Sequence, residues 1–378
     1  MHDSAALGPS PSPLDYSKLV RPEIASFTAY APGTTVSQAK KKYGLETFVK
    51  LSSNENPLGS SPFAAAALRA LDDLHVYVDD EHAELRRRLP KPYGLGIEHV
   101  LLGHGSNDVV RTLFAAYVSA GDEVVLADPT FSLFPEDAIL FGATPVKVPL
   151  REGVHDLDAM LAAITPRTKM VVVVDPNNPT STRVERDAFD RFARALPPSV
   201  ILIIDQAYRE YMPPGSVEGV DYVKSRPATI VLRTHSKLYG LASLRFGYAL
   251  GDRELLAFAQ RVRLPFNVSR PAAVAALAAL DDHEFVRRSL ETNEAGKAYL
   301  YPALAKLGLH VYPSAANFIS VAVPGSANEA YEVLLSRGIV TRSGDALGMP
   351  VRLRITIGTP EQNALLIDAL DSLVAAAA

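Results

Sequence analysis

Residues 230–245 read Ile-Val-Leu-Arg-Thr-His-Ser-Lys-Leu-Tyr-Gly-Leu-Ala-Ser-Leu-Arg. The apolar run at 230–232 predicts a buried strand, and polar residues follow it at once. Lys237 therefore stands just beyond a strand end, with hydroxyl side chains before it and Arg245 after it. A desolvated lysine amine can form a Schiff base with an aldehyde, and the hydroxyls and the guanidinium suit a phosphate. Taken by itself, the stretch also fits a solvated lysine at a strand end.

Four similar apolar runs precede this one. Continuous apolar runs are typical of strands that are buried on both faces, as in parallel sheets. Helical patterns lie between them, at residues 109–118 and 184–196. This alternation predicts an α/β fold around a mostly parallel sheet. The predicted strands are residues 100–102, 124–126, 170–174, 201–204 and 230–232.

The pattern changes after about residue 285. A long helix is followed by predicted strands at 318–321, 339–342 and 353–357, and a last helix starts near Pro360. We interpret this part as a smaller α+β domain that packs with the N-terminal segment. The first fifteen residues, rich in Pro, Ser and Ala, predict a poorly ordered arm. We therefore expect an arm and part of the small domain at 1–60, a large domain at 61–285 and a C-terminal small domain at 286–378.

Composition narrows the class of protein. With 378 residues, of which 48% are hydrophobic and 21% charged, the chain can bury a large core and form more than one domain. A net charge of −4 does not favour nucleic acid or an anionic membrane as a partner. The chain has no cysteine, which excludes disulfides, thiolate catalysis and cysteine-ligated metal. No apolar run approaches the roughly 20 residues of a membrane helix, and the N-terminus has no secretory pattern, so we expect a cytoplasmic protein.

In doubly wound sheets, ligands bind beyond the carboxyl ends of the strands, and the unusual residues of this chain fall there. Gly103-His104-Gly105-Ser106 opens a predicted helix, whose free N–H groups favour a phosphate. Phe131 follows the next strand and offers a flat ring for stacking. Asn178 lies in the turn Asp175-Pro176-Asn177-Asn178-Pro179 and offers an amide. Each feature alone also fits an ordinary turn or core residue.

Asp205 ends the apolar run at 201–204, and Tyr208 follows three residues later. An unpaired carboxylate is costly at the end of an apolar strand. Opposite a pyridinium nitrogen it would be paired, and it would keep that nitrogen protonated. Together with Lys237 about thirty residues downstream, this carboxylate is the strongest functional signal in the sequence.

In this order the motifs resemble those of the histidinol-phosphate aminotransferases, which are fold-type I, class II enzymes that depend on pyridoxal phosphate. The likeness runs from about residue 22 to about residue 374. It implies that Lys237 is the catalytic residue and carries the cofactor. It also implies a cofactor site of Gly105, Ser106, Asn107, Phe131, Asn178, Asp205, Tyr208, Thr234, Ser236 and Arg245, with Tyr77 from a second subunit of a homodimer.

The same resemblance implies that Tyr30, Asn54, Arg342 and Arg354 bind the substrate, and it implies no metal. A guanidinium can hold a carboxylate or a phosphate with two hydrogen bonds. Arg352 has no counterpart in the family, and we expect it to be a surface residue that forms ion pairs. His235 and His104 are expected to be structural or peripheral, because the lysine already supplies the proton transfer.

The chain departs from the family at several points. Residues 74–80 read Leu-His-Val-Tyr-Val-Asp-Asp, whereas the family usually has Arg-Tyr-Pro-Asp, so substrate choice is open. Ser181 follows Thr180 where the family continues with glycine, which leaves the conformation of that turn open. Asp108 replaces the family's usual glutamate, and Pro90 should end a helix.

We expect an aminotransferase that moves an amino group from histidinol phosphate, or from another amino donor, to a 2-oxo acid such as 2-oxoglutarate. Aromatic amino acids and precursors of specialised metabolites would also fit a site anchored by arginine. A decarboxylase or lyase that uses the same cofactor is an alternative, since similar residues surround the ring. A ligand sensor that is not an enzyme is a further alternative, but it would need a nucleic-acid-binding domain for which the chain shows no pattern.

Overall fold

The computed structural model of the chain describes residues 15–25 and 36–377. Contacts divide the chain into two compact units, Met1–Pro32 and Gly33–Ala378. In the first unit the 3-10 helix η1 (Tyr16–Lys18) begins after Asp15, whose carboxylate accepts a hydrogen bond from the Ser17 N–H, and α1 spans Pro22–Ala25. Apart from Asp15, the arm predicted for the first fifteen residues lies outside the described residues.

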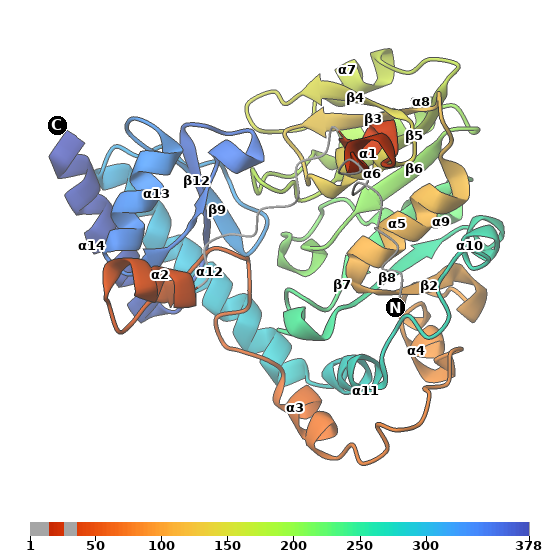
Figure 1. The fold of residues 1–378 in the computed structure, drawn as a ribbon, viewed down its shortest axis with the longest axis horizontal. Helices are drawn as coiled ribbons and strands as arrows, with labels where there is room; N and C mark the ends of the chain where they lie inside the picture. The colour runs from red at the N-terminus through yellow and green to blue at the C-terminus, as the bar shows by residue number, and fades with distance from the viewer. Residues whose placement is uncertain (1–14, 26–35, 378) are drawn as a thin grey trace, which may run out of the picture. The chain divides into compact units, whose positions relative to one another are not determined.

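A seven-stranded sheet is the largest sheet of the second unit (Figure 1). The strand order is β2-β8-β7-β6-β5-β3-β4, and all neighbours are parallel except β8, which runs antiparallel to β2 and β7. The five predicted strands are confirmed, whereas β4 and β8 were not predicted. The strands are β2 (Val100–His104), β3 (Glu123–Asp128), β4 (Thr144–Pro149), β5 (Thr168–Val174), β6 (Ile201–Asp205), β7 (Thr229–Thr234) and β8 (Phe246–Gly251).

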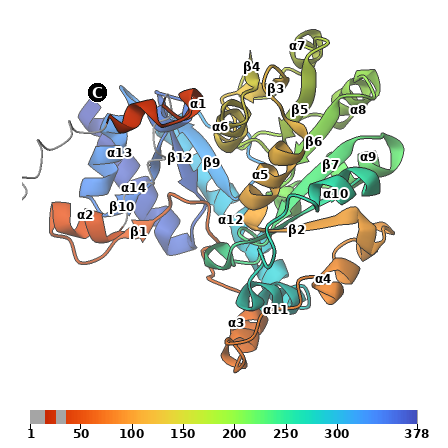
Figure 2. The same cartoon turned by 45° about the vertical axis from the view of Figure 1, so that its right-hand side comes forward.

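Alternate residues of the central strands enter two separate cores. In β5, Val171 and Val173 face one core with Phe189 of α8 (Arg186–Ala195). Met170 and Val172 face the other core with Leu113 of α5 (Gly105–Tyr117). The sheet is therefore covered on both faces, which explains why these strands are apolar throughout rather than alternating. Figure 2 shows α5 and α8 on either side of the strands.

The remaining helices of this part precede the sheet in sequence, connect its strands or follow it. Helix α4 ends two residues before Pro90, as predicted. None of the helices in the described residues is long and apolar enough to cross a membrane. The helices are α3 (Pro62–Arg69), α4 (Ala83–Arg88), η2 (Lys91–Tyr93), η3 (Ile97–His99), α6 (Leu133–Leu140), α7 (Leu157–Ala162), η4 (Arg209–Tyr211), α9 (Gly219–Ser225), η5 (Ala242–Leu244), α10 (Arg253–Ala259) and α11 (Arg270–Ala279).

The strands that follow the long helix α12 (His283–Lys306) form two small sheets, one of which also contains β1 from the N-terminal part of the unit. The order β11-β12-β9 forms an antiparallel sheet, and β1 pairs with β10 in parallel. Leu300 and Leu304 of α12 pack beneath the three-stranded sheet, whereas Val286 and Leu290 pack against Tyr208. The remaining elements are α2 (Val36–Tyr43), β1 (Val49–Lys50), β9 (Phe318–Ala322), α13 (Ala327–Ser336), β10 (Ile339–Val340), β11 (Arg342–Ser343), η6 (Asp345–Leu347), β12 (Arg352–Thr356) and α14 (Pro360–Ala377).

The single strand predicted at 339–342 is wrong. Thr341 separates β10, which pairs with β1, from β11, which pairs with β12. The chain changes sheets here because Val340 packs with Ala39 of α2, whereas Arg342 lies opposite Arg354. The division of the chain near residues 60 and 285 into a large and a small domain stays a prediction.

Candidate active site

The junction of β2 and α5 packs closely against strand β8. Gly105 begins α5 with a φ of +76°, a left-handed conformation that suits glycine. A Cβ atom on Gly247 would lie 2.2 Å from the Ser106 nitrogen, so a side chain there would push the first turn of α5 away. The first N–H groups of a helix have no acceptor within it and attract anions. Residues 104–108 are called the α5 turn below.

Basic and hydroxyl side chains surround this turn. The Arg245 guanidinium lies 2.5 Å from where a Cβ atom on Gly105 would be. The Thr234 hydroxyl lies 3.0 Å from the Ser236 hydroxyl and 3.1 Å from the carbonyl oxygen of Phe246, next to Gly247. Six residues that were predicted for the cofactor site thus belong to this turn, to the end of β7 or to the segment after it: Gly105, Ser106, Asn107, Thr234, Ser236 and Arg245. Sequence reasoning missed Gly247, although its place two residues after Arg245 in an apolar run was a signal.

Lys237 lies in the turn after β7 and points toward the loop at residues 53–56. Its Nζ donates to the carbonyl oxygen of Ser53 over 3.2 Å and lies 5.6 Å from the centre of the Tyr208 ring. The loop reaches this turn because Gly240 has no side chain: a Cβ atom there would lie 2.0 Å from the Gly59 carbonyl oxygen. The predicted lysine is therefore half-buried between two loops from distant parts of the sequence.

Asp205 ends β6 and is 5% exposed. Its carboxylate accepts from the Ala207 N–H over 3.1 Å. Burial raises the pKa of Asp205 to about 6, although this hydrogen bond and the charge of Lys237 both act to lower it. Tyr208 is buried nearby, and its hydroxyl accepts from the side-chain amide of Asn54 over 2.9 Å. The carboxylate, the lysine and the tyrosine thus lie close together, and Asn54 contacts the hydroxyl of the tyrosine.

The side chains of the loop after β5 bind residues of neighbouring segments. The Asn178 amide oxygen accepts from Nη1 of Arg354 over 2.9 Å. Asn177, which was not predicted, accepts from the Thr130 hydroxyl over 2.8 Å and donates to the carbonyl oxygen of Pro129. This contact joins the loop to the turn that carries Phe131, a half-buried ring 6.2 Å from Phe134.

Ser181 settles the turn that the sequence left open. It is fully buried and has a φ of +66°, the left-handed conformation that favours the glycine of the family. Its N–H donates to the carbonyl oxygen of Asn177 over 2.8 Å. The chain thus keeps a glycine-like turn with a serine in it.

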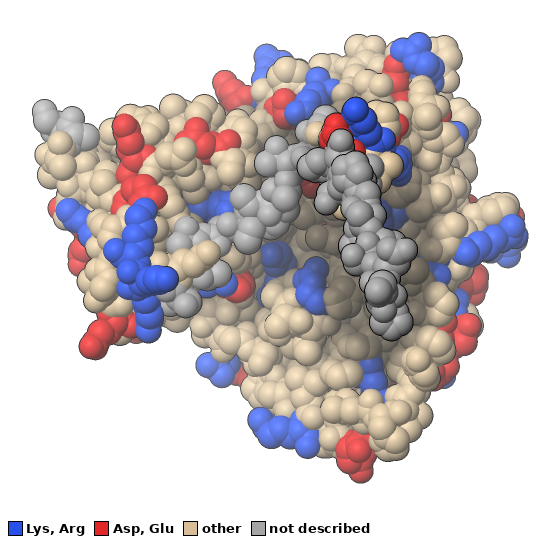
Figure 3. All heavy atoms as spheres, in the orientation of Figure 1, with Lys and Arg blue, Asp and Glu red and all other residues tan. Residues whose placement is uncertain are grey.

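Two arginines face each other across the small sheet. Arg342 of β11 and Arg354 of β12 are paired in register, so their side chains lie on one face. Arg354 donates to Asn178 and, over 2.7 Å, to the carbonyl oxygen of Ser52, and its guanidinium lies 5.7 Å from the centre of the Phe318 ring. Basic side chains are visible in the hollow near the centre of the face shown in Figure 3.

The prediction that Arg352 is a surface residue that forms ion pairs is wrong. The side chain is 8% exposed, and its guanidinium lies 3.7 Å from the centre of the Tyr312 ring. It donates to the hydroxyl and carbonyl oxygens of Ser320 and to the carbonyl oxygen of His310. An arginine is more weakly hydrated than a lysine and stacks on aromatic faces, which allows this buried position.

Tyr77 lies apart from the residues described so far. Its side chain is 79% exposed and packs on Phe266, with ring centres 4.7 Å apart. Tyr30 lies outside the described residues. Within residues 15–25 and 36–377, no group of three or more His, Cys, Asp and Glu side chains is arranged to hold a metal ion.

His235 lies in an aromatic core with Tyr239, Phe246 and Tyr248. It is 1% exposed, its ring stacks on Tyr239 at 4.4 Å, and neither ring nitrogen has a hydrogen-bond partner among the described residues. Burial lowers the pKa of His235 to about 3. His104 is exposed at the start of α5.

We expect His235→Phe to stabilise the protein by about 2 kcal/mol at neutral pH, because it removes unsatisfied buried nitrogens and keeps the ring. The gain should grow toward pH 5. Below the roughly 6.5 of an unfolded histidine, the unfolded chain binds a proton that the folded protein refuses, which lowers the unfolding free energy by about 1.4 kcal/mol per pH unit. Urea unfolding at several pH values measures this.

A second buried histidine provides the control. Nε2 of His155 accepts from the Val174 N–H over 3.3 Å, so His155→Phe should destabilise the protein. A His235→Phe variant that is less stable than wild type would mean that a partner of the imidazole has been overlooked.

Comparison with known proteins agrees with this geometry. Residues 46–370 match the family described as aminotransferase class I and II. The chain is 43% identical to a histidinol-phosphate aminotransferase of Moorella thermoacetica, over 94% of this chain and 93% of that protein. It is 40% identical to histidinol-phosphate aminotransferase 2 of Pseudomonas aeruginosa, over 96% and 99% of the two chains.

A solved structure extends the comparison to the cofactor. The histidinol-phosphate aminotransferase from Sinorhizobium meliloti, in complex with pyridoxal-5′-phosphate, matches with a TM-score of 0.86 at 27% identity. The match covers 95% of this chain and 98% of that chain. The chain therefore belongs to the histidinol-phosphate aminotransferase family and is an aminotransferase that depends on pyridoxal phosphate.

Proposed function

We propose that the enzyme transfers the amino group of histidinol phosphate to a 2-oxo acid such as 2-oxoglutarate. The observation that carries this proposal is the pair Arg342 and Arg354, directly opposite each other on two strands. Like charges at such positions repel, and an anion that binds both removes the repulsion. A donor with a phosphate or with a second carboxylate can bind both arginines. An unphosphorylated aromatic donor has a single carboxylate and therefore makes less use of the pair. The family membership supports transamination over the lyase and sensor alternatives.

The residues around Lys237 fit pyridoxal phosphate. The first turn of α5, Arg245 and the hydroxyls of Thr234 and Ser236 offer a positive, donor-rich cradle of the kind that a phosphate needs. Among the described residues no cationic side chain is bonded to the buried carboxylate of Asp205, and the ring nitrogen would supply a positive partner. Phe131 would stack on the ring, and Tyr208 with the amide nitrogen of Asn178 would hold its phenolic oxygen.

When bound, pyridoxal phosphate supplies an electron-withdrawing ring that stabilises the charge left when the Cα–H bond of the donor breaks. Lys237 holds the cofactor between turnovers and then acts as the base: its Nζ removes the proton from Cα of the donor. Asp205 keeps the ring nitrogen protonated. Arg354, held by Asn178 and Ser52, fixes the anionic end of the substrate so that Cα faces Nζ.

We expect Arg342→Ala to raise the apparent KM for histidinol phosphate by about tenfold or more, since a charge-assisted contact is worth roughly 1.5–3 kcal/mol. The effect on phenylalanine should be smaller. Steady-state kinetics with 2-oxoglutarate as acceptor measure both. Arg337→Ala, which removes an exposed arginine five residues away, is the matched control and should change neither value.

The same assay tests the substrate itself. Wild type should have its highest kcat/KM with histidinol phosphate in a panel that includes phenylalanine and other unphosphorylated amino acids. A higher value for an unphosphorylated donor would reject histidinol phosphate and leave the aminotransferase activity standing. Residues 76–80, which depart from the family, would then be the first to exchange.

We further infer that the enzyme is a homodimer in which Tyr77 serves the site of the second copy. Large apolar side chains are exposed around Tyr77, a pattern that marks a surface covered by a partner. They are Leu74, Val76, Val262, Leu264 and Phe266, between 44% and 67% exposed. Tyr77 itself is held by Phe266 and not by the residues around Lys237 of its own chain.

Mixed dimers test this arrangement. Tyr77→Phe should lower activity about tenfold, the value of one hydroxyl contact to a charged group, and Lys237→Ala should be inactive. In a mixed dimer of the two variants, the site with the intact lysine receives an intact Tyr77 from the other subunit. We therefore expect mixing to restore wild-type activity at that site. No recovery, or a fully active monomer in sedimentation, would contradict the arrangement.

We also infer that the enzyme works in the cytoplasm with small molecules as substrates, and not with nucleic acid or a membrane. A net charge of −4 and the lack of cysteine support this inference. The division into a large cofactor-binding domain at 61–285 and a small domain is part of the same proposal, and the separate cores around the seven-stranded and three-stranded sheets support it.

A further inference from the structure

A continuous line of polar contacts joins the segment that carries Tyr77 to the α5 turn. Its four members are Asp80, Arg263, Asn267 and Asp108, which we call the polar relay. They come from three separate parts of the sequence and meet beside the edge strand β2.

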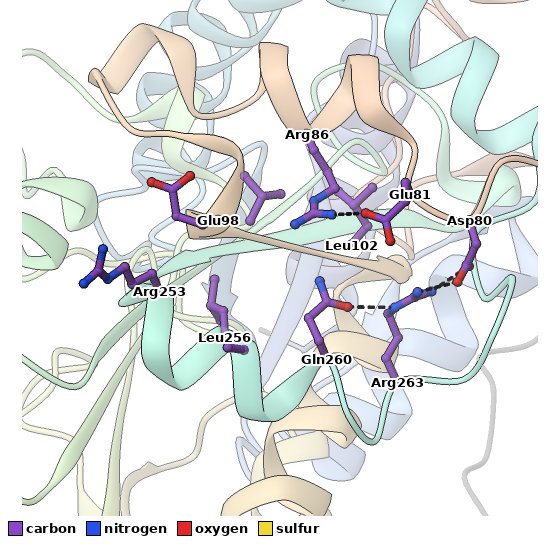
Figure 4. A pocket seen from close by; sticks show the side chains of 11 residues that line it. Asp80, Glu81, Arg86, Glu98, Leu102, Arg253, Leu256, Gln260 and Arg263 are labelled. Carbon is purple, nitrogen blue, oxygen red and sulfur yellow. Dashed lines mark hydrogen bonds and ion pairs between the residues drawn. The ribbon is translucent and has the colours of Figure 1, made fainter.

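The relay begins at an ion pair with two hydrogen bonds. Asp80 accepts from Nη2 of Arg263 over 2.6 Å and from Nη1 over 2.9 Å. This guanidinium holds the pKa of Asp80 below its usual value. The same carboxylate accepts from the N–H of Phe266, the residue on which Tyr77 packs, over 2.7 Å. Figure 4 shows Asp80, Arg263 and Gln260 along one side of a cavity of about 420 Å³.

Asn267 carries the line onward, and both ends of its amide are used. Its oxygen accepts from Nη1 of Arg263 over 2.9 Å. Its nitrogen donates to the carboxylate of Asp108 over 2.6 Å and to the carbonyl oxygen of Leu102 over 3.2 Å. Because a guanidinium can only donate and a carboxylate can only accept, the orientation of the amide is fixed.

Asp108 ends the relay on the backbone of the α5 turn. The oxygen that binds Asn267 also accepts from the N–H of His104 over 2.9 Å. His104 directly precedes Gly105 and Ser106, whose N–H groups belong to the first turn of α5, the proposed phosphate site. The carboxylate of Asp108 would by itself repel a phosphate at this helix end, and the Asn267 amide offsets part of its charge.

We propose that Asp80, Arg263, Asn267 and Asp108 act together as positioning residues that hold the α5 turn in the geometry that binds the cofactor phosphate. This inference rests on the proposed role of the α5 turn. It adds residues that lie outside the set predicted for the cofactor site. If Tyr77 serves a second copy, the relay also links the phosphate site of one subunit to the residue that it lends to the other.

The test compares two ligands that differ in the phosphate alone. Equilibrium dialysis of the cofactor-free protein measures its affinity for pyridoxal phosphate and for pyridoxal. Asn267→Ala should weaken pyridoxal phosphate binding by about tenfold, the lower end of what residues that support the ligands of a bound metal contribute, and should leave pyridoxal binding unchanged. Arg263→Lys, which keeps the charge but loses the planar fork, should weaken pyridoxal phosphate in the same selective way.

A double-mutant cycle tests whether the residues act as one line. The double variant Asp80→Asn with Asn267→Ala should lose no more affinity for pyridoxal phosphate than Asn267→Ala alone. The first substitution already interrupts the contacts, so the second has nothing further to remove. Arg253→Ala removes an arginine that lines the same cavity outside the relay, and it should change neither affinity.

Any other outcome of these two experiments would reject the proposed role of the polar relay. Equal losses for both ligands would show general damage to the fold, additive losses would show independent residues, and unchanged affinities would show no positioning. If wild type itself binds pyridoxal as tightly as pyridoxal phosphate, the phosphate role of the α5 turn fails, and that failure is seen before any variant is made.

Discussion

Asp205→Ala is expected to lower turnover by about three orders of magnitude or more, since the loss falls on the transition state rather than on substrate binding. The carboxylate at the end of β6 is buried and lies within the electrostatic reach of Lys237. Without it, the ring nitrogen of the cofactor loses the anion that keeps it protonated. Single-turnover and steady-state rates with saturating pyridoxal phosphate measure the effect.

A neighbouring carboxylate gives a matched control. Asp175 follows β5, is fully buried, and has its pKa raised to about 7 by that burial. Its carboxylate accepts from the N–H of Val184 instead of facing Lys237. Asp175→Asn should therefore keep most of the activity that Asp205→Asn loses. Turnover of Asp205→Ala within about tenfold of wild type would assign the ring nitrogen to another group.

Stability should move in the opposite direction from activity. The pKa of Asp205 is about 6 in the folded protein and about 3.9 in an unfolded chain. Between these values the folded state holds a proton that the unfolded state releases, so the unfolding free energy falls as the pH rises through that window. Asp205→Asn should thus stabilise the cofactor-free protein by about 2–3 kcal/mol at neutral pH, with little gain near pH 4.

The strands that could be predicted are those buried on both faces of the sheet, because their residues are all apolar. The run at 170–174 is apolar throughout because Val171 and Val172 point to different cores. Strand β8 was not predicted because Gly247 and Gly251 weaken its apolar pattern, and β4 was not predicted because its second and last residues are prolines. Gly247 belongs to β8 for a functional reason: it makes room for the α5 turn.

The sequence allowed us to propose which residues form the site. It did not show which contacts hold those residues in place. Lys237, Asp205 and the α5 turn could be proposed from the sequence because each stands at the end of a predicted strand or directly after it. Arg354 and Asn178 are 176 residues apart in the sequence, and Asp108 and Asn267 are 159 apart. No local sequence pattern therefore predicts these contacts. Arg352 shows the same limit, since its burial depends on Tyr312 and Ser320 from other strands and loops.

Lys237→Ala is expected to abolish transamination and covalent attachment of the cofactor while leaving cofactor binding measurable. Its Nζ is the amine that faces Tyr208 and the loop at residues 53–56. The α5 turn and Arg245 do not depend on it, so pyridoxal phosphate should still bind through its phosphate. Borohydride reduction followed by mass spectrometry of the peptide that contains residue 237 measures the attachment, and dialysis measures the binding.

The control for this change is Lys50→Ala, which removes a lysine paired with Glu55 in the neighbouring loop and should keep both attachment and activity. Added methylamine should restore part of the turnover of Lys237→Ala, because a small amine in the vacated space can remove the Cα proton in place of Nζ. Rescue would separate the loss of the base from damage to the site. A reducible cofactor linkage that persists in Lys237→Ala would place the attachment at another lysine, and the interpretation of the whole loop that follows β7 would have to change with it.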